Sequence, residues 1–210
     1  MLLVLSAPSG GGKTTIARKL LESRNDLGYS VSATTRAIRP GEQEGVDYHF
    51  LSRAEFERRR KTGEFVESAT YGGELYGTLK SEIDRVFSQG RHAVLDIEIE
   101  GARQIRKSFP ESIHLFVLPP SADELVKRLA GRKTEEESRL RKRISRAAEE
   151  LSAVAEYDYA IVNDDLNAAV REVVAILDGR GERWRVRKQE DLPAFVERLR
   201  HGVLEEAEKI

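Results

Sequence analysis

Near its start the chain reads Leu2-Leu3-Val4-Leu5-Ser6-Ala7-Pro8-Ser9-Gly10-Gly11-Gly12-Lys13-Thr14-Thr15. The unbroken apolar run at residues 2–5 predicts a strand that is buried on both faces. After the glycines, Ile16, Ala17, Leu20 and Leu21 recur at helical spacing, which predicts a helix. The order strand, glycine-rich loop and helix is the setting in which a phosphate-binding loop occurs.

The loop has the residue types that triphosphate binding requires. Glycines let successive backbone N–H groups curl around phosphates without Cβ clashes, and the helix N-terminus adds a partial positive charge. Lys13 would reach the β- and γ-phosphates, and the Thr14 hydroxyl would hold Mg²⁺. The usual pattern opens with glycine, and Ala7 takes that place. We therefore expect an ATP site made of Ala7, Pro8, Ser9, Gly10, Gly11, Gly12, Lys13, Thr14 and Thr15.

The composition narrows the class of protein. A chain of 210 residues with 40% apolar and 34% charged residues fits a globular protein of one domain, with or without insertions. The net charge of −1 argues against a dedicated nucleic-acid or membrane binder. The absence of cysteine excludes disulfides and thiolate chemistry and fits a reducing compartment. With no pattern of a signal peptide or membrane span, we expect a cytoplasmic protein.

After the first helix, the sequence predicts a small inserted subdomain. Alternating polar and apolar residues predict strands at residues 28–35, 46–50 and 64–71. Ser52 and Glu55 form a capping box that predicts a helix to about Lys61, and Gly72-Gly73 predicts a hairpin turn. In the third strand Glu67 alternates in register with Phe65, which would put a carboxylate on an apolar face. We expect a mixed or antiparallel insert.

The rest of the chain alternates between predicted strands and helices. Buried strands are predicted at residues 92–97, 113–118 and 158–162, with helices at residues 81–89, 101–107 and 166–177 and near the C-terminus. This pattern predicts a three-layer α/β/α fold of the P-loop NTPase type, with a parallel core sheet. Asp96 ends an apolar run, as in a Walker B strand, and would place a carboxylate near Mg²⁺.

The segment from Gly131 to Arg146 is basic in an otherwise near-neutral chain. Seven basic residues stand against three glutamates: Arg132, Lys133, Arg139, Arg141, Lys142, Arg143 and Arg146 against Glu135, Glu136 and Glu137. A solvated helical face is the ordinary explanation of such a run. Beside a phosphate-binding loop, we favour a mobile lid whose arginines close over the transferring phosphates and exclude water.

Several further motifs, in order, resemble the guanylate kinase family, whose members are nucleoside monophosphate kinases. The resemblance extends to about Leu177 and is carried by the glycine-rich loop and by Ser30-Val31-Ser32-Ala33-Thr34-Thr35-Arg36, Arg39-Pro40-Gly41-Glu42, Asp47-Tyr48, Leu75-Tyr76-Gly77-Thr78, Leu95-Asp96-Ile97 and Ile161-Val162-Asn163-Asp164-Asp165. It implies phosphoryl transfer from MgATP to GMP, and to dGMP, in purine nucleotide metabolism. The implied parts are a core (1–30, 82–120 and 150–210), a GMP-binding subdomain (31–81) and a lid (121–149).

The resemblance also assigns roles to residues. It implies that Arg36 and Arg39, with the Tyr48 and Tyr76 hydroxyls, clamp the GMP phosphate. Glu67 would accept hydrogen bonds from guanine N1–H and the 2-amino group, and the Ser32 and Thr78 hydroxyls would donate to O6. The remaining implied contacts are Asp96 and Glu98 with the substrate, Asn163 beside the adenine of ATP, and Lys13, Arg36, Arg39, Arg132 and Arg143 with the transferring phosphates.

Three residues depart from the family pattern. Glu98 and Glu100 stand where the family commonly has Asp and Gln, and Lys133 stands where a glycine usually follows the lid arginine. Two other functions stay open: another P-loop small-molecule kinase, for example one acting on a ribose bisphosphate, and a non-catalytic guanylate-kinase-like binding module. Ser32 and Thr78 could be plain strand residues, and the two tyrosines could be packing aromatics. The sequence leaves the oligomeric state open.

Overall fold

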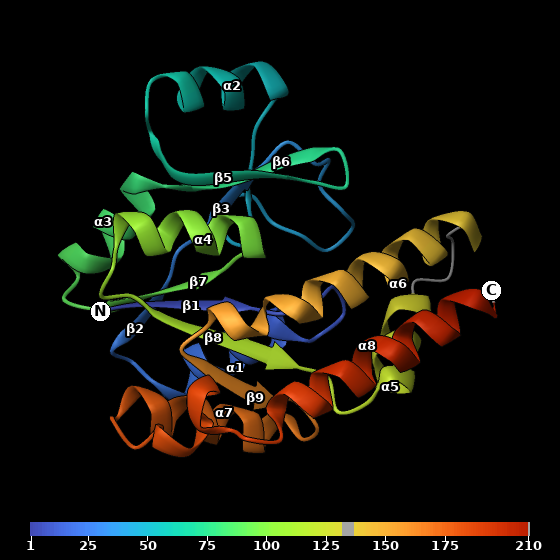
Figure 1. Cartoon of the computed structure of the whole chain (residues 1–210). Coiled ribbons are helices and arrows are strands. Elements are labelled where there is room, and N and C mark those ends of the chain that lie inside the picture. Colours follow the sequence, from blue (N-terminus) through green and yellow to red (C-terminus); the bar gives the residue numbers. More distant parts are fainter. Residues whose placement is uncertain (132–136, 210) are drawn as a thin grey trace. The chain divides into compact units, whose positions relative to one another are not determined.

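The computed structural model describes residues 1–131 and 137–209, with Arg139 described by its backbone alone. The chain divides into two compact units (Figure 1). The first unit comprises Met1–Val4 and Leu21–Ile113, and the second comprises Leu5–Leu20 and His114–Ile210.

A parallel sheet forms the core, as the sequence predicts. Its strands are β1 (Leu2–Ser6), β2 (Leu27–Tyr29), β7 (His92–Asp96), β8 (Ile113–Leu118) and β9 (Tyr159–Val162), in the order β2-β7-β1-β8-β9. The pairs β2–β7 and β8–β9 are both parallel. All of β1 is buried, which confirms the prediction from its apolar run. The glycine-rich loop follows β1 directly and leads into α1 (Lys13–Ser23).

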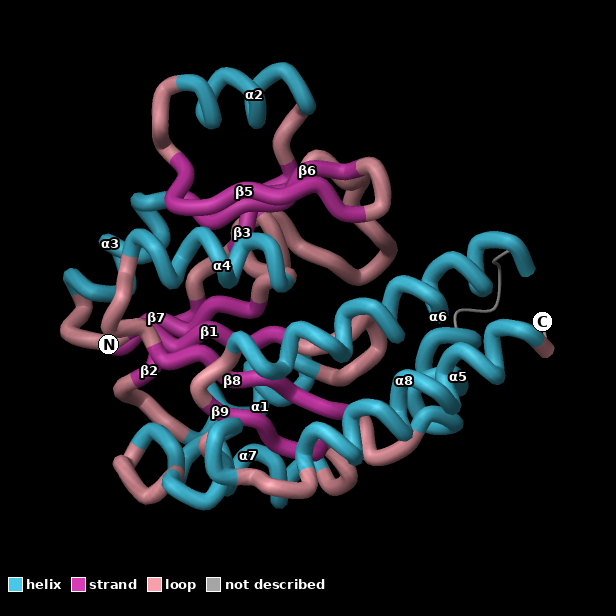
Figure 2. The backbone as a smooth tube through the Cα atoms, in the orientation of Figure 1, coloured by secondary structure: helices cyan, strands magenta, loops and turns pink. Residues whose placement is uncertain are grey.

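Four further helices belong to the second unit: α5 (Ala122–Ala130), α6 (Glu137–Leu151), α7 (Leu166–Leu177) and α8 (Leu192–Glu208). Short 3₁₀ helices lie at Ser152–Glu156, Glu182–Trp184 and Val186–Lys188. Helix α8 runs along both α5 and α6 (Figures 1 and 2). At Gly202 the approach to α5 is so close that a Cβ would lie 2.8 Å from the Ala122 Cβ.

The predicted insert is a second sheet in the first unit. Its strands are β3 (Ser32–Thr34), β4 (His49–Phe50), β5 (Phe65–Tyr71) and β6 (Glu74–Leu79), in the order β4-β3-β6-β5. Strand β3 pairs in parallel with β4, and β6 is antiparallel to both β3 and β5. The sheet is therefore mixed, as predicted. The glycines of the β5–β6 hairpin turn have φ values of 60° and 88°.

One face of this second sheet is covered by α2 (Arg53–Lys61). The predicted cap is confirmed, since the Ser52 hydroxyl accepts a hydrogen bond from the Glu55 N–H at 3.1 Å. The buried Phe56 ring stacks on Phe65 with centroids 4.3 Å apart. Together with Ala33, Leu75 and Leu79, these rings form a small apolar core.

The prediction of a single strand over residues 28–35 is wrong. The structure has β2 in the first sheet and β3 in the second, with Ser30 and Val31 between them. The Ser30 N–H still donates to the Val94 carbonyl of β7, whereas the Val31 N–H donates to the Glu82 carboxylate. Residues 30–34 are buried throughout, so the alternation of residue types does not mark an exposed face.

The strand predicted at residues 46–50 is shortened to His49–Phe50. A turn takes up the residues before it: Gly45 has a φ of 73°, and its N–H donates to the Tyr48 carbonyl at 2.9 Å. This turn places Tyr48 at the start of the strand.

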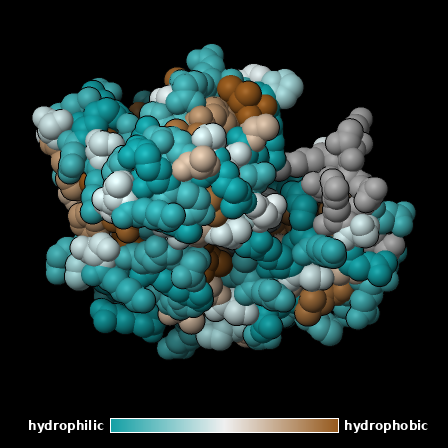
Figure 3. Space-filling model, turned by 90° about the horizontal axis from the view of Figure 1, so that it is seen from above, coloured by the Kyte–Doolittle hydropathy of each residue, from teal (hydrophilic) through white to brown (hydrophobic). Residues whose placement is uncertain are grey.

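The remaining helices of the first unit agree with the predictions. They are α3 (Lys80–Ser88) and α4 (Ile99–Ser108). In the part of the chain that the structure describes, no helix is both long and apolar enough to cross a bilayer. The face seen in Figure 3 is mostly hydrophilic, with separate small apolar groups.

Candidate active site

A bulge in β5 decides which way Glu67 faces. Phe65 pairs with Leu79 and Glu67 pairs with Thr78, so Val66 is an extra residue in the strand. Because neighbouring residues of β6 face opposite sides, Glu67 and Phe65 lie on opposite faces of the sheet. The prediction that the two share an apolar face is therefore wrong. Phe65 faces α2, and Glu67 faces away from that apolar core.

The bulge aligns the three residues predicted to contact the guanine base. Ser32 pairs with Thr78 across β3 and β6, and Thr78 pairs with Glu67 across β6 and β5. Directly paired residues share a face, so the three polar side chains form one row across three strands. All three are buried, with exposed fractions of 6% or less. We call Ser32, Thr78 and Glu67 the base row.

Glu67 is a buried carboxyl group with an altered pKa. The Thr78 hydroxyl donates to Glu67 Oε1 at 2.7 Å. Burial raises the pKa of Glu67 to about 7, although the hydrogen bonds from Thr78 oppose this shift, and the negative charge of Glu98 adds to it. Glu98 stands at the N-cap position of α4, where its side chain makes no capping hydrogen bond. Glu67 and Glu98, which are both predicted to contact the substrate, therefore interact electrostatically.

Helix α4 supports Glu67 closely. A Cβ on Gly101 would lie 2.4 Å from Glu67 Oε2, so a larger residue here would force the carboxylate to shift. Gln104, one turn further along α4, accepts from the Ser68 N–H at 3.1 Å and donates to the Ser68 carbonyl at 2.9 Å. Sequence reasoning did not assign a role to either residue. The side-chain amide of Gln104 binds both polar groups of one β5 residue.

Arg36 and the two predicted tyrosines also lie together. Tyr48 and Tyr76 have ring centroids 6.0 Å apart, and the Arg36 guanidinium lies 5.3 Å from the Tyr48 centroid. Burial opposes charge on Arg36, but the hydrogen bond with Glu42 raises its pKa above the usual value, and Tyr76 adds a smaller contribution. These three predicted phosphate contacts therefore form one cluster within the first unit.

Glu42 organises the turn that carries the two arginines. Its carboxylate accepts from Arg36 Nη1 at 3.0 Å and Nη2 at 2.7 Å, and from the Arg39 N–H at 2.8 Å. The Arg36 hydrogen bond, opposed by burial, keeps the pKa of Glu42 below its usual value. Glu42 is part of the motif at residues 39–42 in the sequence. Its hydrogen bonds with Arg36 could not be predicted, because they depend on the path of the turn. Arg39 itself is exposed.

The glycine-rich loop of the second unit has the backbone conformation that its sequence predicts. Gly10 and Gly12 have φ values of 82° and 90°, which non-glycine residues rarely adopt. The Gly11 N–H donates to the Pro8 carbonyl at 2.8 Å. Lys13 and Thr14 begin α1, so both stand at the helix N-terminus directly after the loop.

Side chains from distant segments hold this loop. Asn163 follows β9, is 7% exposed, and its Nδ2 donates to the Gly11 carbonyl at 3.2 Å. A Cβ on Gly12 would lie 2.4 Å from the same nitrogen. The Ser9 N–H donates to Glu150 Oε2 at 2.8 Å. Asn163 thus supports the loop, and its predicted place beside adenine stays a prediction.

An arginine that the sequence reasoning did not select lies at this loop. Arg128 Nη1 is 3.8 Å from where a Gly12 Cβ would be, and Arg128 Nε donates to Glu124 Oε1 at 2.9 Å. The i, i+4 spacing of Glu124 and Arg128 on one helix could have indicated the pair. Arg143 Nη1 donates to the Leu129 carbonyl at 3.3 Å. Arg132 and Lys133 lie outside the described residues.

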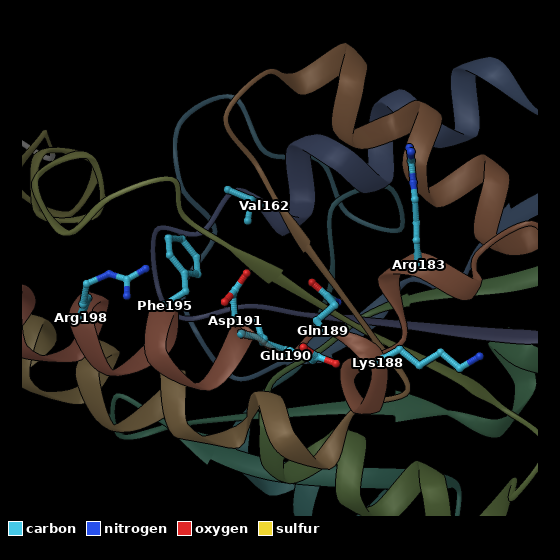
Figure 4. Close-up of a pocket in the computed structure, with 9 residues that line it drawn as sticks. Val162, Arg183, Lys188, Gln189, Glu190, Asp191, Phe195 and Arg198 are labelled. Atoms are coloured by element: carbon cyan, nitrogen blue, oxygen red, sulfur yellow. The ribbon is translucent and has the colours of Figure 1, made fainter.

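The second unit also has a surface pocket with a different set of lining residues (Figure 4). Its volume is about 560 Å³, and it is lined by Val162, Arg183, Lys188, Gln189, Glu190, Asp191, Leu192, Phe195 and Arg198. Gln189 donates to the Ala160 and Trp184 carbonyls, which fixes one wall. Most of the lining comes from the segment before α8 and from its first turns, and none of it is a predicted site residue.

Comparison with known proteins identifies the family. The sequence profile described as guanylate kinase matches residues 1–180. The chain belongs to the guanylate kinase family. It is 49% identical over 178 residues to a guanylate kinase of Trichormus variabilis, with 85% of this chain and 89% of the relative covered. A guanylate kinase of Paramagnetospirillum magneticum is 43% identical over 203 residues, covering 96% of this chain and 94% of the relative.

A solved structure agrees with this assignment. The crystal structure of guanylate kinase from Anaplasma phagocytophilum matches with a TM-score of 0.70 and 35% sequence identity. The match covers 94% of this chain and 93% of that chain. The guanylate kinase fold expected from the motifs is thereby confirmed. The profile ends at residue 180, so the pocket beside α8 lies mainly in a segment beyond the matched family region.

Proposed function

We propose that this guanylate kinase family member transfers the γ-phosphoryl group of MgATP to the phosphate of GMP, yielding ADP and GDP. The observation that carries this proposal is the base row, in which Ser32, Thr78 and Glu67 lie side by side on one buried sheet face. A kinase that acts on a sugar phosphate would not need this combination of two hydroxyl donors and a carboxylate acceptor on one buried face. Intact Lys13 and Thr14 after the loop argue against a non-catalytic binding module.

The base row suits guanine in particular. The ionised Glu67 carboxylate would accept from N1–H and from the 2-amino group, while a hydroxyl donates to O6. Adenine has an acceptor at N1 and a donor at C6, so it would leave buried polar groups unpaired. The Thr78 proton is engaged with Glu67 in this structure, so Thr78 can donate to O6 only after guanine supplies Glu67 with new donors.

The arginine and tyrosine cluster would hold the GMP phosphate. Planar guanidinium groups form bidentate hydrogen bonds with phosphate oxygens, which suits Arg36 and Arg39. The ion pair with Glu42 fixes the orientation of the Arg36 plane before substrate binds. Tyr48 and Tyr76 would add hydroxyl contacts to the same phosphate.

Phosphoryl transfer then depends on alignment and on charge neutralisation. The acceptor oxygen of GMP is already anionic at neutral pH, so no strong general base is required. The loop N–H groups and Lys13 would bind the ATP phosphates, with Arg128, Arg132 and Arg143 as further cations. Mg²⁺ supplies positive charge between the phosphates, and hydroxyl and carboxylate oxygens such as those of Thr14 and Asp96 are the ligand types it prefers.

The proposed division into parts follows from these roles. The core would comprise residues 1–30, 82–120 and 150–210, the GMP-binding subdomain residues 31–81, and the lid residues 121–149. The second sheet falls entirely within the proposed GMP-binding subdomain. We place the reaction in purine nucleotide metabolism in the cytoplasm.

The test is ADP release from MgATP with a panel of acceptors: GMP, dGMP, AMP, CMP, UMP and ribose phosphates. Turnover confined to guanine nucleotides is expected. Turnover with a sugar phosphate would overturn the guanine site but keep the ATP site. Binding of GMP without turnover of any acceptor would indicate a binding module instead.

A further inference from the structure

One contact of the glycine-rich loop has no part in the proposed mechanism. The Ser9 N–H does not point at open solvent but donates to Glu150 Oε2 at 2.8 Å, from a residue 141 positions further along the chain. Glu150 lies in the last turn of α6, and only 10% of its side chain is exposed. A carboxylate this deeply buried is costly unless charged or N–H partners compensate it.

The second oxygen of the same carboxylate has its own partner. Arg146 Nε donates to Glu150 Oε1 at 3.0 Å, from one turn earlier in α6. The guanidinium supplies the positive charge that the buried carboxylate requires. Glu150 therefore joins a backbone N–H of the loop to an arginine of the helix.

Helix α6 also carries a predicted lid arginine. Arg143, Arg146 and Glu150 are spaced by three and four residues, which puts them on one face of the helix. The guanidinium of Arg143 reaches the Leu129 carbonyl at the end of α5. The C-terminal end of this arginine-bearing face is thus connected to the phosphate-binding loop through Glu150.

Asn163 and Glu150 hold the loop at different points. Asn163 holds the Gly11 carbonyl, and Glu150 holds the Ser9 N–H. Asn163 is attached to the end of a core strand, whereas Glu150 is attached to the helix that follows the proposed lid loop. The Glu150 contact links the geometry of the loop to the orientation of α6.

We propose that Glu150 is a positioning residue for ATP, which couples the phosphate-binding loop to the arginine-bearing helix α6. It acts through Ser9 and Arg146 and does not itself contact the nucleotide. By fixing both, it holds the loop N–H groups and the α6 arginines in one arrangement before the triphosphate binds. This inference rests on the proposed role of the loop as an ATP site.

The test compares substitutions at Glu150 with one at its neighbour. Glu150→Ala removes both hydrogen bonds, and we expect MgADP affinity to fall and the KM for ATP to rise by about tenfold, the size expected for losing a charge-assisted hydrogen bond. The KM for GMP should change less than about twofold, since GMP binding is assigned to other residues. Glu150→Gln keeps an acceptor for Ser9 but places an NH2 donor against the Arg146 N–H, so its MgADP affinity should lie between those of Glu150→Ala and the unaltered protein. Glu149→Ala, at an exposed position of the same helix, is the matched control and should behave as the unaltered protein.

Hydrogen exchange gives a second readout that does not depend on turnover. Amide exchange in the peptide that contains Ser9 should be faster in Glu150→Ala than in Glu149→Ala. Equal MgADP affinities in these two variants, or equal rises in the KM values for ATP and GMP, would overturn the proposal. If Glu150→Ala does not fold, Glu150→Asp withdraws the carboxylate by one methylene, and an unchanged MgADP affinity in that variant would also overturn it.

The experiment separates this proposal from the proposed function. MgADP binding is measured without any acceptor. A tenfold loss of affinity in Glu150→Ala, in a protein that does not phosphorylate GMP, would overturn the proposed function and support the role of Glu150.

Discussion

The base row of the first unit and the glycine-rich loop of the second would bind their predicted ligands in different ways. In the base row, three buried side chains on neighbouring strands present the hydrogen-bonding groups. In the loop, the backbone presents them, and side chains such as Asn163 only hold the backbone in place. We therefore expect a base to be recognised by side chains that can be substituted, and a phosphate by a backbone conformation that depends on glycine.

This contrast has a consequence for substitutions. Removing a side chain from the base row should abolish recognition of the base and leave the ATP site unchanged. Adding a side chain to a loop glycine should weaken ATP binding and leave recognition of the base unchanged. The four predictions below test this contrast, from the largest expected effect to the smallest.

Glu67→Ala should have the largest effect. It removes the only carboxylate in the base row, with its two proposed hydrogen bonds to guanine. We expect kcat/KM for GMP to fall by about 1,000-fold, which corresponds to two hydrogen bonds involving a charged group. Steady-state kinetics with varied GMP and varied ATP would measure it. A rise in the KM for ATP of similar size would contradict the separation of the two sites.

The raised pKa of Glu67 should make stability depend on pH. Its pKa is about 7 when folded, compared with 4.5 for an ordinary glutamate, so the folded protein binds the proton more tightly than the unfolded chain. This contribution is fully present below pH 4.5 and is lost as the pH rises through 7. Glu67→Gln cannot ionise but can still accept from Thr78.

The free energy of unfolding of Glu67→Gln should therefore increasingly exceed that of the unaltered protein as pH rises, by up to about 3 kcal/mol at pH ~8. Urea unfolding of both proteins at pH ~5 and pH ~8 would measure the difference. A difference that is the same at both pH values would contradict the assigned pKa.

Gly12→Ala should damage the other site. A Cβ here would approach Asn163 Nδ2 to 2.4 Å, and the φ of 90° is unfavourable for alanine. Strain of this kind costs on the order of 1–3 kcal/mol, so MgADP affinity should fall by up to about 100-fold. Calorimetric titration would measure it, with GMP binding as the internal control. Parallel loss of GMP binding would mean that the two sites are not separable.

Gly101→Ala should have the smallest effect of the four. The new methyl group would meet the flexible end of Glu67, which can shift by giving up its hydrogen bond with Thr78. A lost hydrogen bond predicts a loss of GMP affinity of about tenfold. Fluorescence or calorimetric titration with GMP would detect it. Unchanged GMP affinity would show that Gly101 does not position the carboxylate.

Much of this arrangement could be predicted from the sequence because the signals are local. The apolar run of β1, the Ser52 cap and the Gly72-Gly73 hairpin each depend on a few neighbouring residues. The glycines before Lys13 likewise predicted the loop. These features follow from backbone geometry and burial of one segment at a time.

The features that the sequence did not reveal depend on contacts between distant segments. The β5 bulge reverses the face of Glu67, and only its pairing with β6 shows this. Residues 28–35 are divided between β2 and β3 because the two parts of this extended stretch pair with strands of different sheets. Arg128, Glu150 and Gly101 owe their roles to neighbours that are far away in the sequence.

The most direct test of the account compares GMP with IMP, which lacks the 2-amino group, in the unaltered protein and in Glu67→Gln. The unaltered protein should favour GMP in kcat/KM by about 100-fold, since IMP leaves one proposed donor to a buried carboxylate missing. In Glu67→Gln the preference should shrink to less than about tenfold, because the neutral amide loses the charge that binds this donor. A preference for GMP that is equally large in both proteins would contradict recognition of guanine by Glu67.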